Sequence, residues 1–290
     1  MMLIQYGLNI IECVNFIMIN IENEYLGLLG GVLHGGTEKP DRTGTGTLAV
    51  FGRMLRHDMA LGFPILTTKK IYFEKAAAEL SWILSGRTDL DYLHTHNVKY
   101  WDADYKRSGR TDGTLGPVYG KQWRRWGNND QLFTLLQQIQ DNPSSRRLMV
   151  SAWNVGELDD MVLPPCHHGF QVYCVNGEMS LMWQQRSADI FLGLPYDIVM
   201  YGLLLELLAE GNGYKPKQLI ASLGDCHLYN NHIEAAKIQL ERSTFELPQL
   251  KIPYGIKLRG KGNYTYIPEP DEIKLNNYKY HKPIKAKLST

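Results

Sequence analysis

Hydrophobic residues recur along this chain with two different periods, which predicts a mixture of helices and strands. Over residues 72–86 apolar side chains recur at steps of three and four, as on one face of a helix, and Gly86 is a typical helix end. Residues 198–210 are apolar nearly all round, which indicates a helix buried in the core.

Other segments have the composition of β-strands. Residues 146–153 and 218–223 are two of them, and Asn176-Gly177 separates two more, 170–175 and 178–184, as in a β-hairpin. Strands and helices mix without a repeated strand–helix–strand rhythm, which favours an α+β fold over a doubly wound one. Neither a Walker A loop nor a GxGxxG fingerprint is present.

Composition and charge narrow the class of protein. A chain of 290 residues with 44% hydrophobic and 21% charged residues is typical of a soluble globular protein. A formal net charge of +1 gives no general attraction for duplex DNA or an acidic membrane, so we expect neither partner. The four cysteines lack the spacing of metal ligands, which predicts no metal site and free thiols in a reducing, cytoplasmic setting.

The two ends of the chain differ from the rest. Residues 1–17 are apolar, but Glu12 and Asn15 interrupt them, and a basic region and a small-residue cleavage site are missing. We interpret them as an N-terminal extension, or as translation begun upstream of a true start at Met18, followed by one domain over residues 18–290. From about residue 253 the chain is rich in Pro, Tyr and Lys, and we expect it to be irregular with short strands.

One cysteine stands in a context that suits a nucleophile. In "LPPCHHG" Cys166 follows two prolines and precedes two histidines, so a rigid turn would present its thiol. A neighbouring His or Arg would favour the thiolate, which is the nucleophilic form. The alternative is a small buried residue, and the local sequence leaves both interpretations open.

Several arginines occupy polar, turn-rich or strand-end positions that suit a phosphate group. They are Arg42 in "DRTGTGT", Arg146 and Arg147 in "SSRRLMVSAW", and Arg186 in "QQRSAD", where Ser187 adds a hydroxyl donor. The alternative is solvated surface charge, which accounts for most arginines.

Two further positions suggest polar roles. Glu79 lies at the edge of the apolar stripe of its helix, where a half-buried carboxylate could carry a proton; alternatively it is a surface residue paired with Lys75. His227 and Tyr229 in "GDCHLY" would face the same side of a strand and could hold a hydroxyl group, or form a core pair.

Taken together and in order, these motifs resemble the thymidylate synthase family. "DRTGTGT", "GPVYGKQW", "SRR", "VSAWN", "PPCH", "QRSAD", "LGLP" and "GD.HLY.NH" occur at the family's spacing, from about Tyr25 to Ala286. The resemblance implies an α+β domain around a large mixed sheet that forms the interface of a homodimer. It also implies transfer of a one-carbon unit from 5,10-methylenetetrahydrofolate to C5 of a pyrimidine nucleotide.

The resemblance implies a role for each matching residue. Cys166 would add to C6 of the pyrimidine, Glu79 would shuttle protons, and Tyr119 and His167 would belong to the catalytic water network. The implied phosphate ligands are Arg42, Arg186 and Ser187, with Arg146 and Arg147 from the other subunit. His227 and Tyr229 would hold the 3′-hydroxyl, and Gln185 in "QRSAD" would also contact the nucleotide. The implied folate contacts are Lys69, Trp101, Asp189 and Gly193.

At position 197 the chain departs from the family, which has asparagine there. That amide donates to O4 of uracil and accepts from N3–H, whereas cytosine offers an amino donor and an unprotonated N3. Asp197 can accept from N4–H₂ and support a proton on N3, and it would oppose O4 of uracil. This exchange is the pattern of deoxycytidylate hydroxymethylases, phage relatives of the family. The alternative is an N-cap of the apolar helix that follows.

Further departures from the family bear on the identity of the product. The end of the chain, residues 287–290, is more polar than in the family, Asp104 replaces a tryptophan and Gln184 a tyrosine, which favours entry of water and a hydroxymethyl product. Trp101, which shields the methylene in the family, is retained. We therefore predict a dCMP hydroxymethylase, with a dCMP methylase and an ordinary thymidylate synthase acting on dUMP as alternatives. A catalytically inactive binding protein is disfavoured by the intact Cys166. A phage that modifies its DNA would be a natural source.

Overall fold

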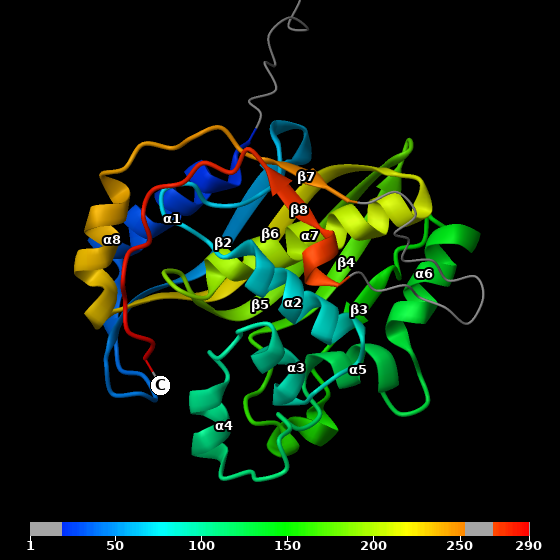
Figure 1. The fold of residues 1–290 in the computed structure, drawn as a ribbon, viewed down its shortest axis with the longest axis horizontal. Coiled ribbons are helices and arrows are strands. Elements are labelled where there is room, and N and C mark those ends of the chain that lie inside the picture. The colour runs from blue at the N-terminus through cyan, green and yellow to red at the C-terminus, as the bar shows by residue number, and fades with distance from the viewer. Residues whose placement is uncertain (1–18, 253–268, 290) are drawn as a thin grey trace, which may run out of the picture.

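A six-stranded mixed sheet forms the centre of the computed structural model, which describes residues 19–252 and 269–289 (Figure 1). The order is β1-β2-β6-β5-β4-β3; β5 and β6 run parallel, and the other neighbours are antiparallel. The strands are β1 Thr37–Lys39, β2 Thr47–Asp58, β3 Met149–Ser151, β4 His167–Val175, β5 Glu178–Asp189 and β6 Lys215–Tyr229. The α+β class and the single domain with a large mixed sheet are confirmed.

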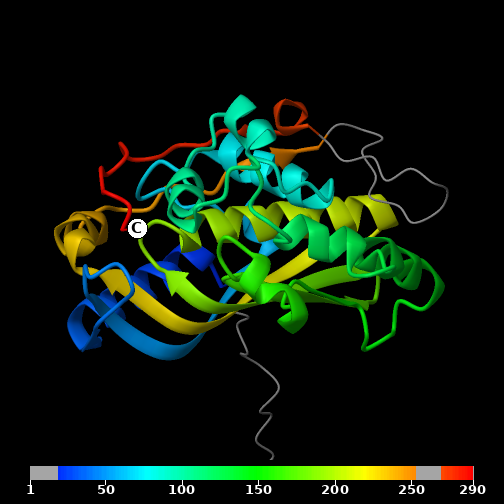
Figure 2. The same ribbon diagram turned by 90° about the horizontal axis from the view of Figure 1, so that it is seen from below.

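Helices cover the sheet and connect its strands. They are α1 Ile21–Gly35, α2 Phe73–Leu84, α3 Leu90–Thr95, α4 Asp102–Ser108, α5 Tyr119–Arg125, α6 Gln131–Asp141, α7 Leu194–Asn212 and α8 Ile233–Leu240. Short 3₁₀ turns, η1 to η4, span Met59–Leu61, Val155–Asp160, Asn230–His232 and Pro270–Glu272, and β7 Gln249–Lys251 pairs with β8 Lys274–Asn276. Figure 2 shows α7 lying along the sheet with α2 stacked above it.

The apolar helix α7 forms the centre of the core. Its side chains are buried on nearly every face because β5 and β6 lie on one side and α2 on the other. Tyr201 stacks on Trp183 of β5 with ring centroids 5.0 Å apart. Gly202 lies so close to Pro64 that an added Cβ would come within 2.4 Å of its ring, so this contact requires glycine. The helix ends at Gly213, whose φ is 75°.

Several sequence predictions are confirmed, and others need correction. The helix expected over 72–86 is α2, and Asn176 and Gly177 both have positive φ in the predicted hairpin turn. The strand expected over 218–223 extends over all of β6, and the helix expected from 198 begins earlier, at Leu194, because Pro195 suits a first turn. Prediction of a strand over 146–153 is wrong in extent, since β3 covers only Met149–Ser151.

The predicted terminal segments are only partly within the described residues. Residues 1–17, interpreted as an extension, lie outside them, as do residues 253–268 of the tail that was expected to be irregular. The described part of that tail contains η4 and the short strand β8, followed by an extended segment to residue 289.

Candidate active site

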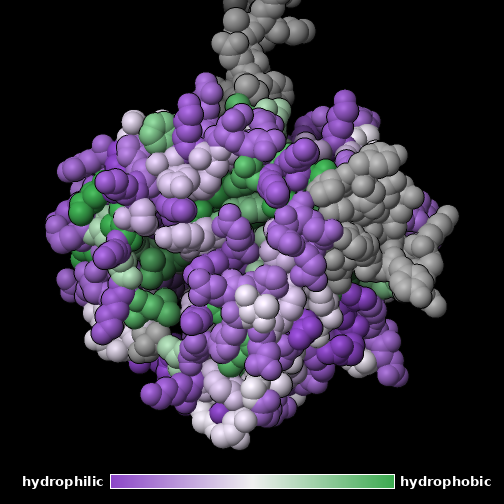
Figure 3. Space-filling view, in the orientation of Figure 1, coloured by the Kyte–Doolittle hydropathy of each residue, from purple (hydrophilic) through white to green (hydrophobic). Residues whose placement is uncertain are grey.

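A cavity of about 740 Å³ opens between the ends of β5 and β6, the first turn of α7, and helices α2 and α4. That volume is typical of a small-molecule site. Most of the face in Figure 3 is hydrophilic, and hydrophobic side chains appear beside the C-terminal segment, near the mouth of the cavity. Ala286, Leu288 and Ser289 of that segment form part of the wall.

Most of the residues singled out from the sequence meet in this cavity. Those in its wall are Arg42, Glu79, Trp101, Tyr119, Cys166, His167, Gln185, Arg186, Ser187, Asp189, Gly193, Asp197, His227 and Tyr229. They come from segments that are distant in the sequence, and the sheet and α7 bring them together. The structure therefore groups arginine, thiol, imidazole and carboxyl side chains around one space.

Three predicted residues do not line the cavity. Lys69 is buried elsewhere, where its ammonium donates to the carbonyl of Phe191 and lies 3.6 Å from the centre of that ring. Burial lowers the pKa of Lys69 to about 7. Arg146 and Arg147 were expected to open a strand, but they lie exposed in the turn before β3. The folate role of Lys69 and the phosphate role of the two arginines remain predictions.

The turn before β4 presents Cys166 to the cavity. Arg186 holds this turn. Its side chain donates to the carbonyl oxygens of Pro164 and Pro165, at 2.8 and 2.9 Å, and its backbone N–H donates to the carbonyl oxygen of Cys166 at 2.9 Å. The amide of Cys166 donates to the Tyr119 hydroxyl at 3.0 Å. The prolines and these bonds fix the backbone that carries the thiol.

The expectation that a neighbouring His or Arg keeps Cys166 as a thiolate is not confirmed. Burial raises the pKa of the Cys166 thiol to about 11, and the charge of Arg186 only partly opposes this effect. His167 contributes no positive charge at neutral pH, since burial lowers its pKa to about 3. In the free protein the side chain is therefore a thiol.

Gln185 fixes the position of the Asp197 carboxyl group. The indole N–H of Trp183 donates to Oε1 of Gln185 at 3.0 Å. Because an indole nitrogen can only donate, Oε1 of Gln185 must face Trp183, and the Nε2 group therefore faces Asp197. That group donates to Oδ2 of Asp197 at 2.8 Å, which leaves Oδ1 of Asp197 beside His167, 3.9 Å from its Nε2.

Asp197 is not the N-cap of α7, which corrects the alternative considered from the sequence. Gly193 occupies the cap position, and Asp197 lies within the first helical turn with its side chain toward the cavity. Burial raises the pKa of Asp197 to about 7, and the hydrogen bond from Gln185 opposes this effect. Among the residues that the structure describes, only Gln185 donates to this carboxyl group, and a buried carboxyl group with so few partners is costly unless a ligand uses it.

Substitution of Asp197 by asparagine is expected to stabilise the free protein increasingly as the pH rises. The pKa is near 3.8 in an unfolded chain and about 7 in the folded one, so between these values only the unfolded state loses its proton. The cost to the folded state is absent below about pH 4 and reaches about 3–4 kcal/mol above pH 7. Denaturant unfolding at pH 5 and pH 8 should show the advantage of Asp197→Asn growing by about 2–3 kcal/mol. A constant difference would mean that the folded carboxyl group is already ionised at pH 5.

Glu79 projects from α2 into the cavity and is not paired with Lys75. Its carboxylate accepts hydrogen bonds from the Tyr100 hydroxyl at 2.5 Å and from the Trp101 indole at 2.8 Å, so the surface ion pair considered from the sequence is wrong. Burial raises the pKa of Glu79 despite these two donors. Tyr100 was missed from the sequence, although it directly precedes the predicted Trp101.

The polar end of the cavity combines positive charge with hydroxyl groups. Asp41 holds the loop that carries Arg42 by accepting from the amides of Thr43 and Gly46, both at 2.6 Å. Arg42, Arg186 and Ser187 all line the cavity. Two cationic side chains with a hydroxyl donor can bind a phosphate group.

His227 and Tyr229 face the cavity from β6, on the same side of the strand as predicted, with ring centroids 5.2 Å apart. Nδ1 of His227 is 3.1 Å from Oδ1 of Asp225, whose other oxygen accepts from Lys39. Asp225 therefore orients the imidazole, and Nε2 is left for a ligand. Lys39 and Asp225 were not singled out from the sequence, although Asp225 belongs to the quoted motif "GDCHLY" and Lys39 lies two positions before "DRTGTGT".

The other end of the cavity is more apolar. Trp101, Leu192, Tyr196 and Leu288 form its wall, and the turn into α7 is held by Asp189, which accepts from the amides of Phe191 and Leu192 at 3.0 and 3.1 Å. Such a surface suits a flat aromatic ligand.

The described residues contain no group of three or more His, Cys, Asp or Glu side chains that could hold a metal ion. Within the same residues, no helix is both long and apolar enough to cross a membrane. A comparison with protein families found a match to the model described as "Thymidylate synthase", which covers residues 23–290.

Proposed function

The chain belongs to the thymidylate synthase family, and from this premise we propose that it forms 5-hydroxymethyl-dCMP from dCMP. Family membership supports a folate-dependent transfer of a one-carbon unit to C5 of a pyrimidine nucleotide. The choice of dCMP rests on one observation, which is the orientation of Asp197 by Gln185.

The orientation of Asp197 suits cytosine. Because Oδ2 already accepts from Gln185, Oδ1 is the atom that can meet the base, and it can accept from the N4 amino group. A carboxyl group with a pKa of about 7 can also share a proton with N3, which stabilises the ring when electrons move toward N3 and C4. Uracil would place O4 against an acceptor, and the unpaired contact would oppose binding.

The other side chains would bind the nucleotide and prepare its ring. Arg42, Arg186 and Ser187 would bind the phosphate group, while His227 and Tyr229 would hold the 3′-hydroxyl. Sγ of Cys166 would then bond to C6, which makes C5 nucleophilic. Glu79, whose pKa burial raises, would carry a proton beside the Trp101 indole that donates to it.

The apolar end of the cavity fits the folate cosubstrate. Trp101, Asp189 and Gly193 would contact it, and when bound 5,10-methylenetetrahydrofolate supplies the one-carbon unit. The apolar wall and the volume of about 740 Å³ leave room for two ring systems. Lys69 would have to leave the Phe191 carbonyl to reach the folate.

Product identification tests this proposal. The protein is incubated with 5,10-methylenetetrahydrofolate and either dCMP or dUMP, the product is identified by mass, and dihydrofolate is followed by absorbance. We expect 5-hydroxymethyl-dCMP without dihydrofolate. A methyl product with dihydrofolate would replace the hydroxymethyl assignment by the alternative dCMP methyltransferase, and turnover of dUMP alone would indicate an ordinary thymidylate synthase.

We also propose a homodimer that completes the site with Arg146 and Arg147 of the second subunit. Two features support it: these arginines lie exposed outside the cavity, and the face of the sheet away from α7 exposes hydrophobic side chains. Tyr173 and Met54 on that face are 64% and 48% exposed, and Met149 near the arginines is 54% exposed. An apolar face of this kind is typical of a dimer interface.

Mixing two inactive variants tests the shared site. Arg147→Ala and Cys166→Ser should each be nearly inactive alone, because one lacks a phosphate ligand and the other the nucleophile. After exchange of subunits, mixed dimers would contain one intact site, and activity should return to about a quarter of the wild-type value. If the mixture stays inactive while mass measurement shows mixed dimers, Arg147 does not act across the interface.

A further inference from the structure

Helix α4 places a second carboxylate, Asp104, in the wall of the cavity beside Trp101. Asp104 follows Trp101 by three positions, and since Trp101 already has helical dihedrals the two side chains lie on the same side of the helix. Both residues line the cavity. The Asp104 side chain is only 16% exposed, so its carboxylate is turned inward rather than toward solvent.

The two oxygens of Asp104 have different surroundings. Oδ1 accepts from Arg107 at 2.9 Å and lies 3.8 Å from Arg42. Oδ2 has no hydrogen-bond partner among residues 19–252 and 269–289. Burial raises the pKa of Asp104 while Arg42 opposes this effect, and the charge of Asp104 is one of those that raise the pKa of Cys166. One oxygen is thus held by arginines, and the other, which lacks a donor among the described residues, belongs to a side chain in the wall of the cavity that also contains Cys166.

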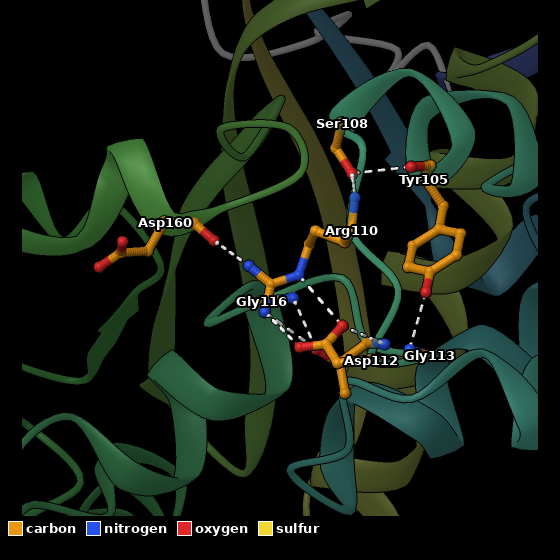
Figure 4. Close-up of polar contacts among 8 residues, drawn as sticks. Tyr105, Ser108, Arg110, Asp112, Gly113, Gly116 and Asp160 are labelled. Atoms are coloured by element: carbon orange, nitrogen blue, oxygen red, sulfur yellow. Dashed lines mark hydrogen bonds and ion pairs between the residues drawn. The ribbon is translucent and has the colours of Figure 1, made fainter.

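A hydrogen-bond network fixes α4 and therefore Asp104. The next residue, Tyr105, accepts from the amide of Gly113 at 2.7 Å through its hydroxyl group (Figure 4). Arg110 binds both oxygens of Asp112, at 3.2 and 2.6 Å, and donates to the carbonyl of Asp160 at 3.1 Å. These contacts tie the loop after α4 to η2, so the helix cannot turn its carboxylate out of the cavity without breaking them.

Glu79 is less free to bind a further ligand at the same end. Each of its oxygens already accepts a hydrogen bond, one from Tyr100 and one from Trp101. A water molecule beside the Trp101 indole would therefore donate to Oδ2 of Asp104, which accepts no hydrogen bond from the described residues. A carboxylate with a raised pKa takes a proton from water more readily than an exposed one.

We propose that Asp104 accepts the proton of the water molecule that attacks the methylene carbon on C5, and so directs the reaction to the hydroxymethyl product. This inference rests on the proposed function. The water oxygen bonds to the exocyclic methylene carbon of the nucleotide, and the methylene double bond shifts to C5–C6. The C6–S bond breaks, its electron pair goes to Sγ of Cys166, and the proton of the water goes to Asp104.

The test compares Asp104→Asn with two matched controls. Asp102→Asn removes a carboxylate from the same helix, where it is 45% exposed and paired with His94, and Arg107→Gln removes the surface partner of Asp104 but keeps its carboxylate. Three quantities are measured with dCMP: exchange of the C5 hydrogen with solvent in the absence of folate, the rate of hydroxymethyl product formation, and the fraction of a thioether product formed when 2-mercaptoethanol is added.

Asp104→Asn should exchange the C5 hydrogen at close to the wild-type rate, because that exchange needs addition of Cys166 and proton transfer at C5 but no attack of water on a methylene carbon, and this result also shows that the variant is folded. Its hydroxymethyl product should form about 10²-fold more slowly, since a positioned base contributes at least that much. The fraction captured by the added thiol should rise, because the intermediate with a methylene group on C5 persists longer before water adds to it. Both controls should behave as wild type.

Two outcomes would overturn the inference. Normal hydroxymethyl formation by Asp104→Asn would show that another group receives the proton. Equal loss in Arg107→Gln would show that the ion pair matters rather than the free oxygen. Failure of the proposed function is separate, because the wild-type protein would then form no hydroxymethyl product, and a protein that does not act on dCMP would also show no C5 exchange on it.

Discussion

Replacement of Cys166 by serine is expected to abolish nucleotide turnover, with a loss of at least about 10⁴-fold. Addition to C6 requires a sulfur nucleophile, and a serine hydroxyl at the same place is far harder to ionise. The structure supports this expectation through placement, since the turn held by Arg186 and Tyr119 presents the thiol to the cavity. Release of the C5 hydrogen from labelled nucleotide, which can occur only after this addition, measures whether the addition step takes place.

A second buried thiol provides the control for Cys166. Burial raises the pKa of Cys174 to about 11, the same value as for Cys166, but Cys174 lies on β4 outside the cavity. Cys174→Ser should therefore retain turnover and C5-hydrogen release. If Cys166→Ser also released the C5 hydrogen, the nucleophile would have to be another group.

Replacement of Asp197 by asparagine is expected to reverse the preference between the two bases. Gln185 can only donate toward position 197, so the new amide must turn its Oδ1 to Gln185 and its Nδ2 to the base. The base would then meet a donor, which suits O4 of uracil and opposes the amino group of cytosine. A site built around such a bond discriminates by large factors, and we expect the ratio of kcat/KM values to shift toward dUMP by about 10³-fold.

The measurement belongs at pH 8, where a carboxyl group with a pKa of about 7 is ionised in the wild-type protein. Asp197→Asn combined with Gln185→Leu is the matched control, because without the donor from Gln185 the amide can take either orientation. The double variant should discriminate weakly between dCMP and dUMP. An unchanged preference in Asp197→Asn alone would mean that another group reads the base.

Local patterns were sufficient for much of the fold. The steps of three and four over 72–86 and the Asn-Gly pair at 176–177 correspond to α2 and the β4–β5 turn because short-range geometry decides both. The extents of β3 and β6 could not be predicted in this way. β6 extends to Tyr229 because it pairs along its length with β2 and β5, and these strands are distant in the sequence.

The identity of most site residues could be predicted from sequence motifs. Their protonation and their contacts could not, because these depend on the surrounding structure. Cys166, Glu79 and Asp197 were each singled out and meet in one cavity. That the thiol is protonated in the free protein follows from burial, which no local pattern reports. The position of Lys69 against Phe191, and the open oxygen of Asp104, likewise depend on contacts between distant segments.

The proposed dimer rests on an exposed turn and an exposed sheet face. Arg146 and Arg147 lie in an exposed turn, and the sequence alone gave them a strand position. Their predicted role requires a second subunit whose contacts would fall on the hydrophobic sheet face that includes Tyr173 and Met54. The mixing experiment addresses this role independently of which base is bound.

Competition between dCMP and dUMP for the wild-type protein tests the central claim most directly. Both nucleotides are supplied together at equal concentration with 5,10-methylenetetrahydrofolate at pH 8, and the two products are quantified from the same reaction. The orientation of Asp197 by Gln185 predicts a product derived from dCMP in excess of about 10²-fold. An excess of product derived from dUMP would contradict the claim that Asp197 selects cytosine.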